Sequence, residues 1–387
     1  MSQNTINVGL IGYKFMGKAH SGAYLKVAKF FEPKLRPVMK AVCGRSEKDV
    51  AEFAERFDWE GYETDWRKLV DRDDIELIDI GTPGSTHRDI AVAAAEAGKH
   101  VFCEKPLAFT LDESRDMLAA AEKAGVKHMV NFNYRRCPAV SLAKRMIEND
   151  DIGEVRHARF TYLQDWLVDP QFPMNWRMRK EAAGSGAHGD LGSHSIDMAR
   201  YLVGELTDVV GQKKTFITER PAEGESSGLT ATAGEGTEKV TVDDCSMWLA
   251  KFESGALGTF EATRLAPGRK NFNRFEINGS KGSLVWCFEQ LNWLQFYSTE
   301  DASAGQGFRQ ILATEADHPY AGNWWPPGHM LGYEHGFVHA VYDLLEDIAH
   351  DRHCQPDFRD GAQCVSVLEA VEKSIDAGAW AAVERVP

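Results

Sequence analysis

The sequence lacks any apolar run close to the roughly 20 residues that a bilayer-spanning helix needs. It also lacks an excess of positive charge, because 44 Lys and Arg stand against 58 Asp and Glu, for a formal net charge of −14. Nucleic-acid surfaces need clustered Lys and Arg to neutralise phosphates. We therefore expect neither a membrane nor a nucleic acid as a partner, although one helix N-terminus still suits a small anionic ligand.

Cysteines are few and show no pairing pattern. There are seven, an odd number, and none of them forms a Cys-x-x-Cys pair. Secreted disulfide frameworks use even numbers of cysteines at regular spacings. The first five residues are polar and run straight into a predicted strand, so we expect no signal peptide. These observations favour a reduced protein of the cytoplasm.

Metal-ligand patterns are also scarce. His335 and His339 lie four residues apart on a predicted helix, but no Cys or carboxylate stands near them at a convincing ligand spacing. We interpret the two histidines as a coincidence of the helix face. We therefore expect no metal site.

What the sequence does contain is a globular composition in 387 residues, 43% hydrophobic and 26% charged, and this length favours two domains. The first third alternates short apolar runs with helical patterns, which predicts a parallel sheet with crossover helices. The expected strands are residues 6–11, 38–42, 77–80, 101–102 and 126–131, and the expected helices are residues 17–30, 47–57 and 87–97. A capping box at Thr110 and Glu113 predicts a further helix that ends near Gly125.

The pattern changes after Asn133. Residues 155–163 alternate with a strand period, and two pairs of runs, 246–252 with 256–262 and 272–277 with 283–287, flank turns as hairpins. Residues 221–236 are rich in Gly, Ser, Thr and Ala, which predicts a mobile loop, and 330–350 and 361–383 predict closing helices. We predict an α/β protein with a Rossmann dinucleotide-binding domain over residues 1–131 and a second α/β domain, with a largely antiparallel sheet, over residues 132–387.

A dinucleotide signature lies between the first strand and its helix. Gly12 would make the tight turn, and Gly17 would let helix and strand pack closely. The pyrophosphate would then rest on the N–H groups at the start of the helix. Lys14 stands where the pattern has its middle glycine, so the motif is incomplete.

The end of the second strand bears on the choice of cofactor. A Rossmann domain that binds NAD usually places an acidic residue there for the ribose 2′-OH. This chain has Gly44, Arg45 and Ser46 instead, with no acid. Arg45 and Ser46 suit a 2′-phosphate and favour NADP, whereas Arg45 stacked on adenine would not discriminate between the two cofactors. The strand end leaves both open.

Two separated segments together suit alcohol oxidation. Lys105, between Glu104 and Pro106, follows the fourth strand at the edge of the sheet where ligands of such folds bind. Asp190 and His194 are four residues apart and would share one side of a first helical turn. A neutral His is suited to take the hydroxyl proton, and an ammonium to stabilise the alkoxide that develops. Each residue also has a structural interpretation: a surface loop lysine, an N-cap aspartate and a hydrogen-bonded core histidine.

Several motifs in order resemble a known family. They are Gly12…Gly17-Lys18-Ala19-His20, Thr82-Pro83…His87, Glu104-Lys105-Pro106-Leu107, Asn133-Tyr134-Arg135, Trp176-Arg177 and Gly186-Ala187…Asp190…Gly192…His194. Their succession looks like that of the glucose-fructose oxidoreductase/inositol dehydrogenase (Gfo/Idh/MocA) family. No motif is specific alone, but their order and spacing are. The resemblance implies a Rossmann domain followed by an α/β domain with a large open sheet, through which members commonly form homodimers or homotetramers.

The resemblance also implies roles for individual residues. Lys105 would orient the substrate hydroxyl, His194 would act as base, and Asp190 would contact both the substrate and His194. Tyr134, Trp176 and Arg177 would complete the substrate site together with these three. Cofactor contacts would come from Gly12, Phe15, Met16, Arg45, Thr82, Pro83, His87, Glu104, Lys105 and Asn133.

The glycine motif of this chain points to one subgroup of the family. The run from Gly12 to His20 is similar to that of a subgroup which includes levoglucosan dehydrogenase, and this shifts the expected cofactor to NAD, with NADP as the alternative. His188 and Gly189 stand where relatives more often have apolar residues, which puts the lining of the pocket there in doubt. The implied reaction is oxidation of one secondary hydroxyl of a cyclic sugar or anhydrosugar, with levoglucosan or a glycoside at C3 as the specific expectation.

Other activities remain open within the resemblance. An inositol dehydrogenase is the nearest rival. Some relatives instead use bound NAD transiently to cleave glycosides by oxidation, elimination and reduction. A sugar-sensing regulator on the same fold is a further class, against which the presence of Lys105, Asp190 and His194 together argues.

Overall fold

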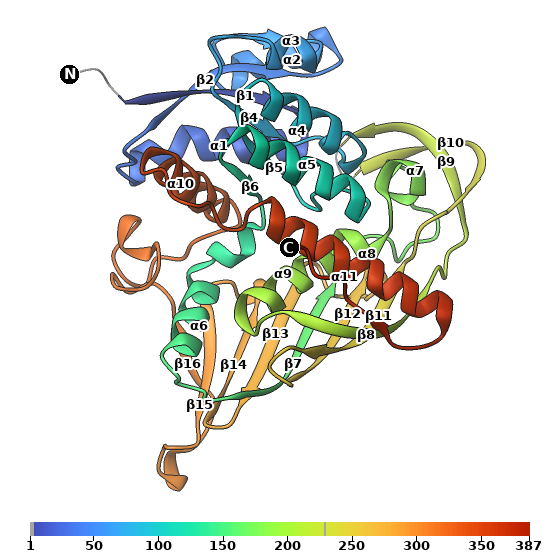
Figure 1. Ribbon diagram of the computed structural model, residues 1–387. Coiled ribbons are helices and arrows are strands. Elements are labelled where there is room, and N and C mark those ends of the chain that lie inside the picture. The colour runs from blue at the N-terminus through green and yellow to red at the C-terminus, as the bar shows by residue number, and fades with distance from the viewer. Residues whose placement is uncertain (1–3, 228–229) are drawn as a thin grey trace. The chain divides into compact units, whose positions relative to one another are not determined.

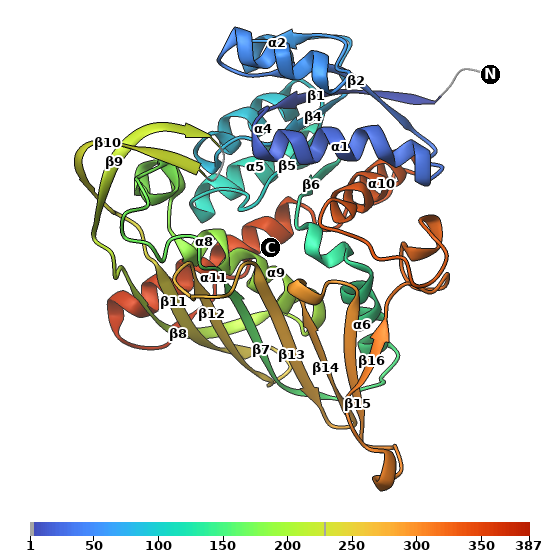
Figure 2. The ribbon, with the colours of Figure 1, turned by 180° about the vertical axis from the view of Figure 1, so that it is seen from behind.

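The computed structural model describes residues 4–227 and 230–387 (Figures 1 and 2). Its contacts group the chain into two compact units. Unit 1 consists of Met1–Asn133, Tyr333–Val365 and Val386–Pro387, and unit 2 consists of Tyr134–Gly332 and Ser366–Arg385. The domain boundary after residue 131 stays a prediction, and the packing adds a later segment of the chain to unit 1.

Unit 1 is built on a six-stranded parallel sheet with the order β3-β2-β1-β4-β5-β6. The strands are β1 (Thr5–Ile11), β2 (Arg36–Cys43), β3 (Tyr62–Glu63), β4 (Leu77–Ile80), β5 (His100–Cys103) and β6 (His128–Val130). The helices are α1 (Phe15–Phe30), α2 (Glu47–Arg56), α3 (Trp66–Val70), α4 (His87–Glu96), α5 (Leu111–Ala124) and α10 (His335–Ala349), and α10 lies against α1 (Figures 1 and 2). The predicted strands and helices of this region are confirmed.

Local sequence explains where these elements begin and end. All four residues of β4 are buried, as expected for a strand that is covered on both faces. Thr110 and Glu113 form the predicted capping box of α5, and Gly125 ends that helix with a left-handed φ of 66°. The short elements β3 and α3 were not predicted, since two and five residues are too few to show a period.

Unit 2 is built on a nine-stranded sheet with the order β16-β15-β14-β13-β7-β12-β11-β8-β17. All neighbours are antiparallel except β12 and β7, so the predicted mostly antiparallel sheet is confirmed. The strands are β7 (Val155–Leu163), β8 (Leu206–Lys214), β11 (Cys245–Phe252), β12 (Leu257–Thr263), β13 (Phe272–Gly279), β14 (Gly282–Cys287), β15 (Trp293–Ser298), β16 (Arg309–Leu312) and β17 (Ala381–Ala382). Both predicted hairpins are present.

The two faces of this sheet differ. Helices α6 (Pro138–Glu148), α8 (Ala187–Asp190) and α9 (Gly192–Leu202) pack on one face (Figure 1). Figure 2 views the opposite face, where the strands lie in front of these helices. Side chains of β11 alternate between buried and exposed along the strand, with Met247 and Leu249 on its exposed side. The sheet is therefore half-buried, with one face in the core of unit 2.

Residues 221–236 are not the mobile loop that their composition predicts. The described residues there form an antiparallel ribbon of β9 (Glu219–Ser227) and β10 (Thr230–Lys239), while residues 228 and 229 lie outside the described part of the chain. Arg179 donates to Glu223 at 2.6 Å and to Glu238 at 2.7 Å, one acceptor from each strand. The buried Arg220 donates to the carbonyl oxygens of 167 and 169. The prediction was wrong because these long-range bonds leave no mark on local composition.

The C-terminal part corrects a second prediction. Helices α10 and α11 (Phe358–Ala377) confirm that the chain closes with two helices. The second ends before Gly378, whose φ is 62°, and the chain then enters β17. The predicted helix over 361–383 is therefore wrong at its end. Among residues 4–227 and 230–387, none of the helices combines the length and apolar character that a membrane crossing requires.

Candidate functional site

The turn between β1 and α1 has the shape of a dinucleotide cradle. Gly12 has a φ of +111°, and a Cβ placed there would lie 2.7 Å from the carbonyl oxygen of Gly81. A Cβ at Gly17 would lie 2.3 Å from the carbonyl oxygen of Gly12. Both positions therefore require glycine, the first for the tight turn and the second for the close approach of helix and strand. The structural roles predicted for both glycines are confirmed.

The start of α1 fits a bound diphosphate. Lys14 occupies the N-cap position, where no described side chain caps the helix, and the first turn holds no acidic residue. The first N–H groups of a helix need acceptors and favour anions. Phe15 is 43% exposed at this end and stacks on Tyr333 with ring centroids 6.4 Å apart. The start of α1 therefore suits the pyrophosphate of NAD, and the tight turn at Gly12 is present with Lys14 in the position of the motif's middle glycine.

The end of β2 is where the adenine ribose is expected. Arg45 is exposed there, while the Ser46 hydroxyl caps α2 by accepting from the N–H of Asp49 at 3.4 Å. A Cβ at Gly44 would lie 2.1 Å from the ring of Tyr13, so glycine is needed for this close packing. Ser46 thus has a structural role as the cap of α2, and Arg45 is exposed at the strand end.

His87 braces two loops at the carboxyl edge of the parallel sheet. Its Nε2 lies 2.9 Å from the carbonyl oxygen of Thr82, and its Nδ1 lies 3.1 Å from that of Pro106. Burial is the main reason that the pKa of His87 is lowered. The structure therefore brings Thr82 and Pro83 together with the Lys105 loop through His87. Contact of these residues with the cofactor stays a prediction, as does that of Met16 and Asn133.

Glu104 has its side chain in a buried polar network. Its Oε1 lies 2.9 Å from Nε2 of His20 and accepts from Nδ2 of Asn131 at 2.6 Å. Its Oε2 accepts from the backbone N–H of Lys105 at 3.1 Å. Asp79 at the end of β4 and Tyr24 on α1 complete the network. Sequence reasoning placed His20 in a motif but did not find this network, because its members lie up to 111 residues apart.

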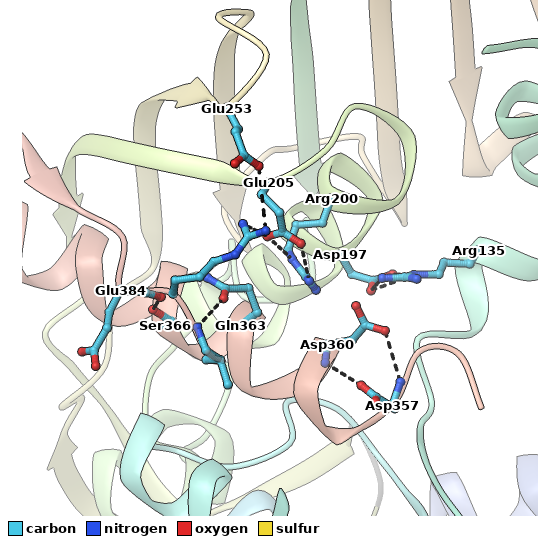
Figure 3. Close-up of polar contacts among 12 residues, drawn as sticks. Arg135, Asp197, Arg200, Glu205, Glu253, Asp357, Asp360, Gln363, Ser366 and Glu384 are labelled. Atoms are coloured by element: carbon cyan, nitrogen blue, oxygen red, sulfur yellow. Dashed lines mark hydrogen bonds and ion pairs between the residues drawn. The ribbon is translucent and has the colours of Figure 1, made fainter. Parts of the chain in front are cut away.

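In unit 2, Tyr134 and His194 lie together. The two ring centroids are 4.5 Å apart, and the His194 side chain is buried on α9. Arg135 fixes this contact, since its Nη2 donates to Asp197 at 2.6 Å from one turn further along α9 (Figure 3). A buried bidentate pair of this kind holds its two elements in one geometry. The ion pair between Arg135 and Asp197 thus holds Tyr134 in contact with His194.

Asp190 ends helix α8 and does not cap α9. The N-cap position of α9 is Leu191, so the N-cap interpretation of Asp190 is wrong. Its carboxylate instead accepts from Nη2 of the buried Arg264 at 2.7 Å. Arg264 also donates to the carbonyl oxygen of Arg177 at 3.3 Å, and the Arg177 guanidinium lies 4.4 Å from the centre of the Trp176 ring. Asp190, Arg177 and Trp176 therefore belong to one polar cluster around Arg264.

Arg264 was missed because no motif surrounds it in the sequence. A second polar group joins Tyr162 to Asn271: the Tyr162 hydroxyl donates to Oδ1 of Asn271 at 2.7 Å and lies 2.9 Å from the Tyr134 hydroxyl. The Tyr162 ring also lies 5.7 Å from that of His194. The aromatic rings around His194 therefore have polar groups beside them, namely the two tyrosine hydroxyls and the amide of Asn271.

His188 lies in the interior of unit 2. Its side chain is buried, with Nδ1 3.1 Å from the Ser246 hydroxyl and Nε2 3.1 Å from the carbonyl oxygen of Leu368. The backbone N–H of His188 donates to Asp243, as does that of Gly186. A histidine at this position therefore has a structural role in which its polar atoms are satisfied.

A cavity of about 440 Å³ lies in unit 2 beside β13, β14 and β15. Its lining includes Phe272, Arg274, Trp286, Glu289 and Trp293. None of the predicted catalytic or substrate residues lines it. The predicted site residues of unit 2 gather instead around His194 and Arg264.

Two family models match the chain in succession. The first, an oxidoreductase family with an NAD-binding Rossmann fold, matches residues 6–132, and the second, the GFO/IDH/MocA C-terminal domain, matches residues 140–285. The chain belongs to the Gfo/Idh/MocA family of oxidoreductases. The family predicted from the sequence, NAD as cofactor and the dehydrogenase class are confirmed.

Individual members of the family are similar over the whole chain. Levoglucosan dehydrogenase of Pseudarthrobacter phenanthrenivorans is 45% identical over 386 residues, which cover 98% of this chain and 99% of that protein. The structure of an oxidoreductase domain protein from Kribbella flavida is 48% identical, with a TM-score of 0.94 and coverage of 99% and 100%. A levoglucosan dehydrogenase in complex with NADH and levoglucosan is 43% identical, with a TM-score of 0.93 and the same coverage.

Proposed function

We propose that this protein oxidises one secondary hydroxyl of a cyclic sugar or anhydrosugar, with levoglucosan as substrate and the 3-OH converted to a 3-keto group. The observation that carries the proposal is the similarity to levoglucosan dehydrogenase over nearly the full length of both proteins. The presence of Lys105, Asp190 and His194 in this chain supports it. Inositols are the alternative substrates.

The roles follow from the chemistry of each side chain. NAD supplies the hydride acceptor when it is bound. Lys105 donates to the reacting hydroxyl, orients it and stabilises the negative charge that develops on its oxygen. His194 takes the hydroxyl proton as general base, and its contacts with the rings of Tyr134 and Tyr162 hold the imidazole in place and exclude water from one side of it.

Asp190 accepts from a sugar hydroxyl and orients His194 in this proposal. Its bond to Arg264 uses Oδ2. Because the Asp190 side chain is about one third exposed while that of Arg264 is buried, the carboxylate is the member of the pair that reaches a ligand. Trp176 and Tyr134 supply aromatic surface for the C–H faces of a sugar ring, and Arg177 supplies donors beside them.

A substrate screen tests the proposed function. The purified protein is incubated with levoglucosan, glycosides, monosaccharides or inositols, and NADH and NADPH formation are recorded separately. We expect NADH with levoglucosan and a 3-keto product by NMR. Faster turnover of an inositol would overturn the substrate assignment. Release of an aglycone from a glycoside without net NADH would show oxidation–elimination–reduction chemistry instead.

We also propose that copies of the chain associate through the exposed face of the nine-stranded sheet into a homodimer or homotetramer. Met247, Leu249 and Leu257 are 49%, 50% and 58% exposed on that face. Leu257 pairs with Lys251 in the register of β11 and β12, which places it on the same face as the other two. Exposed apolar patches of this kind mark interaction surfaces.

We also propose that the protein is located in the cytoplasm. All seven cysteines are free, which supports this proposal.

A further inference from the structure

His20 occupies the centre of a buried network that the proposed chemistry does not use. It lies on α1, and its side chain is 1% exposed. Nδ1 lies 2.8 Å from both carboxylate oxygens of Asp79, and Nε2 lies 2.9 Å from Oε1 of Glu104. Asp79 also accepts from the Tyr24 hydroxyl at 2.8 Å, and Glu104 accepts from Asn131 at 2.6 Å. One imidazole thus bridges two buried carboxylates.

This geometry calls for the imidazolium form of His20. Each ring nitrogen faces a carboxylate oxygen, and because an ionised carboxylate can only accept, these contacts favour a proton on both nitrogens. The amide Nδ2 of Asn131 also lies 3.2 Å from Nε2. Burial by itself lowers the pKa of His20, but the two carboxylates outweigh it and raise the pKa to about 10. Burial likewise raises the pKa of Glu104, yet His20 and Lys105 bring it below the usual range. Buried charges are tolerated when they are paired and hydrogen-bonded in this way.

The network reaches Lys105 through Glu104. Oε1 of Glu104 is held by His20 and Asn131, and Oε2 accepts from the backbone N–H of Lys105. Asp79 belongs to β4, while Glu104 and Asn131 follow β5 and β6 directly. His20 therefore ties the helix that begins at the dinucleotide turn to the carboxyl ends of three adjacent strands.

We infer that His20 is a positioning residue for Lys105: by holding the Glu104 carboxylate, it fixes the peptide from which the Lys105 side chain projects. The inference rests on the role of Lys105 in the proposed function. It concerns the half of the imidazole that faces Glu104, whereas the half that faces Asp79 anchors the ring. A purely structural histidine would need both halves equally.

Two amide variants separate these halves. The amide nitrogen of His20→Asn takes the place of Nδ1 and keeps a donor to Asp79, while that of His20→Gln takes the place of Nε2 and keeps a donor to Glu104. We expect kcat to fall about 10-fold or more in His20→Asn and much less in His20→Gln, because misplacing a positioning group costs up to about 100-fold. NADH affinity and the KM for NAD should change little in either variant. Tyr24→Phe is the matched control, since it removes a bond to Asp79 and leaves Glu104 untouched.

Hydrogen exchange keeps the test independent of the substrate. The N–H of Lys105 donates to Glu104, so a peptide covering residues 100–109 should exchange faster in His20→Asn than in His20→Gln. If levoglucosan and the other sugars give no turnover with the wild type, the proposed function fails, while this exchange difference still tests the positioning.

Equal exchange in both amide variants would overturn the inference, as would a loss of kcat that merely follows the melting temperature across all three variants. If His20→Asn does not fold, Asn131→Ala takes its place, because it removes the other donor to the same oxygen. Faster exchange of the Lys105 peptide is expected there as well, and unchanged exchange would count against the inference.

Discussion

At the scale of the residue, Lys105 carries the most direct consequence of the proposed function. Lys105→Ala should lower kcat by about 100-fold or more, because removing one donor that stabilises a developing oxyanion costs about 2.7–4 kcal/mol. NADH binding and the melting temperature should remain close to those of the wild type. Steady-state kinetics with levoglucosan, together with NADH titration by fluorescence, measures both effects.

Lys123→Ala is the matched control, since Lys123 is an exposed lysine in the last turn of α5. It should leave kcat, NADH binding and stability unchanged. Turnover by Lys105→Ala at the wild-type rate would show that the assignment of Lys105 is wrong. A loss of NADH binding equal to the loss of kcat would point to a cofactor role alone.

The raised pKa of His20 predicts how stability depends on pH. Its pKa is about 10 in the folded protein against 6.5 in an unfolded chain, so the folded state binds the extra proton between these values. The stabilisation is complete below pH 6.5 and is lost as the pH rises to about 10, at about 1.4 kcal/mol per pKa unit. Urea unfolding of the wild type and of His20→Gln should give a stability difference that shrinks by a few kcal/mol across this window.

The pKa values of the groups around His20 bear on this comparison of the wild type with His20→Gln. Burial raises the pKa of Glu104, but its bond to His20 outweighs this effect and brings the pKa below its usual range. Tyr24 and Cys103 stay neutral, since burial raises the pKa of both well above its usual value. A difference in stability that is constant from pH 6 to 10 would contradict the assignment of a charged imidazolium.

Residues in motifs were predictable from the sequence, and residues that act through space were not. Gly12 and Gly17 were found because a tight turn and a close approach demand glycine at fixed spacing. Arg264 was not found, because its partner Asp190 lies 74 residues earlier. A single arginine after a strand belongs to no sequence pattern that would mark it. His20 stood in a motif, yet only the fold brings it to Asp79 and Glu104.

At the scale of the element, the β1–α1 turn yields a prediction with an internal control. Gly12→Ala places a Cβ 2.7 Å from the carbonyl oxygen of Gly81 at a φ of +111°. It should lower the free energy of unfolding by about 1–3 kcal/mol and weaken NADH binding, because the turn can no longer close. Gly22→Ala lies in α1 with no described atom within 4 Å of the new Cβ, and should raise stability by up to about 1 kcal/mol. Denaturant unfolding and NADH titration compare the two variants, and equal effects would contradict this account of the turn.

Elements with strong periodicity were predicted, and elements fixed by distant partners were not. The strands of the parallel sheet are short apolar runs that both faces bury, so they stand out in the sequence. The ribbon of β9 and β10 has the composition of a loop. It is held by bonds from Arg179, which lies outside the run 221–236, and from Arg220, which directly precedes that run. Strand β17 is two residues long and pairs with β8, more than 160 residues earlier. Local pattern carries no information about such pairing.

At the scale of the whole molecule, the fold class followed from the order of the elements. Alternating strands and helices require a parallel sheet, and successive hairpins require an antiparallel one. Residues 333–365 belong to unit 1, which the order of the elements did not predict. The apolar face of an amphipathic helix shows that the helix covers a core, but not which core it covers. Helix α10 contacts α1, and most of its buried residues are apolar.

The exposed sheet face of unit 2 carries the last prediction. If copies associate there, the wild type should sediment as a dimer or larger, and a double variant with Leu249→Asp and Leu257→Asp should sediment at the single-chain mass of 43.2 kDa. Burying a leucine side chain contributes about 1.5–3 kcal/mol, and a buried unpaired carboxylate costs more than that gain. Met330→Asp is the matched control, because Met330 is 52% exposed but lies outside the sheet strands. Sedimentation velocity at several concentrations distinguishes the outcomes: a single-chain wild type, or a double variant that still assembles, would exclude this face as the interface.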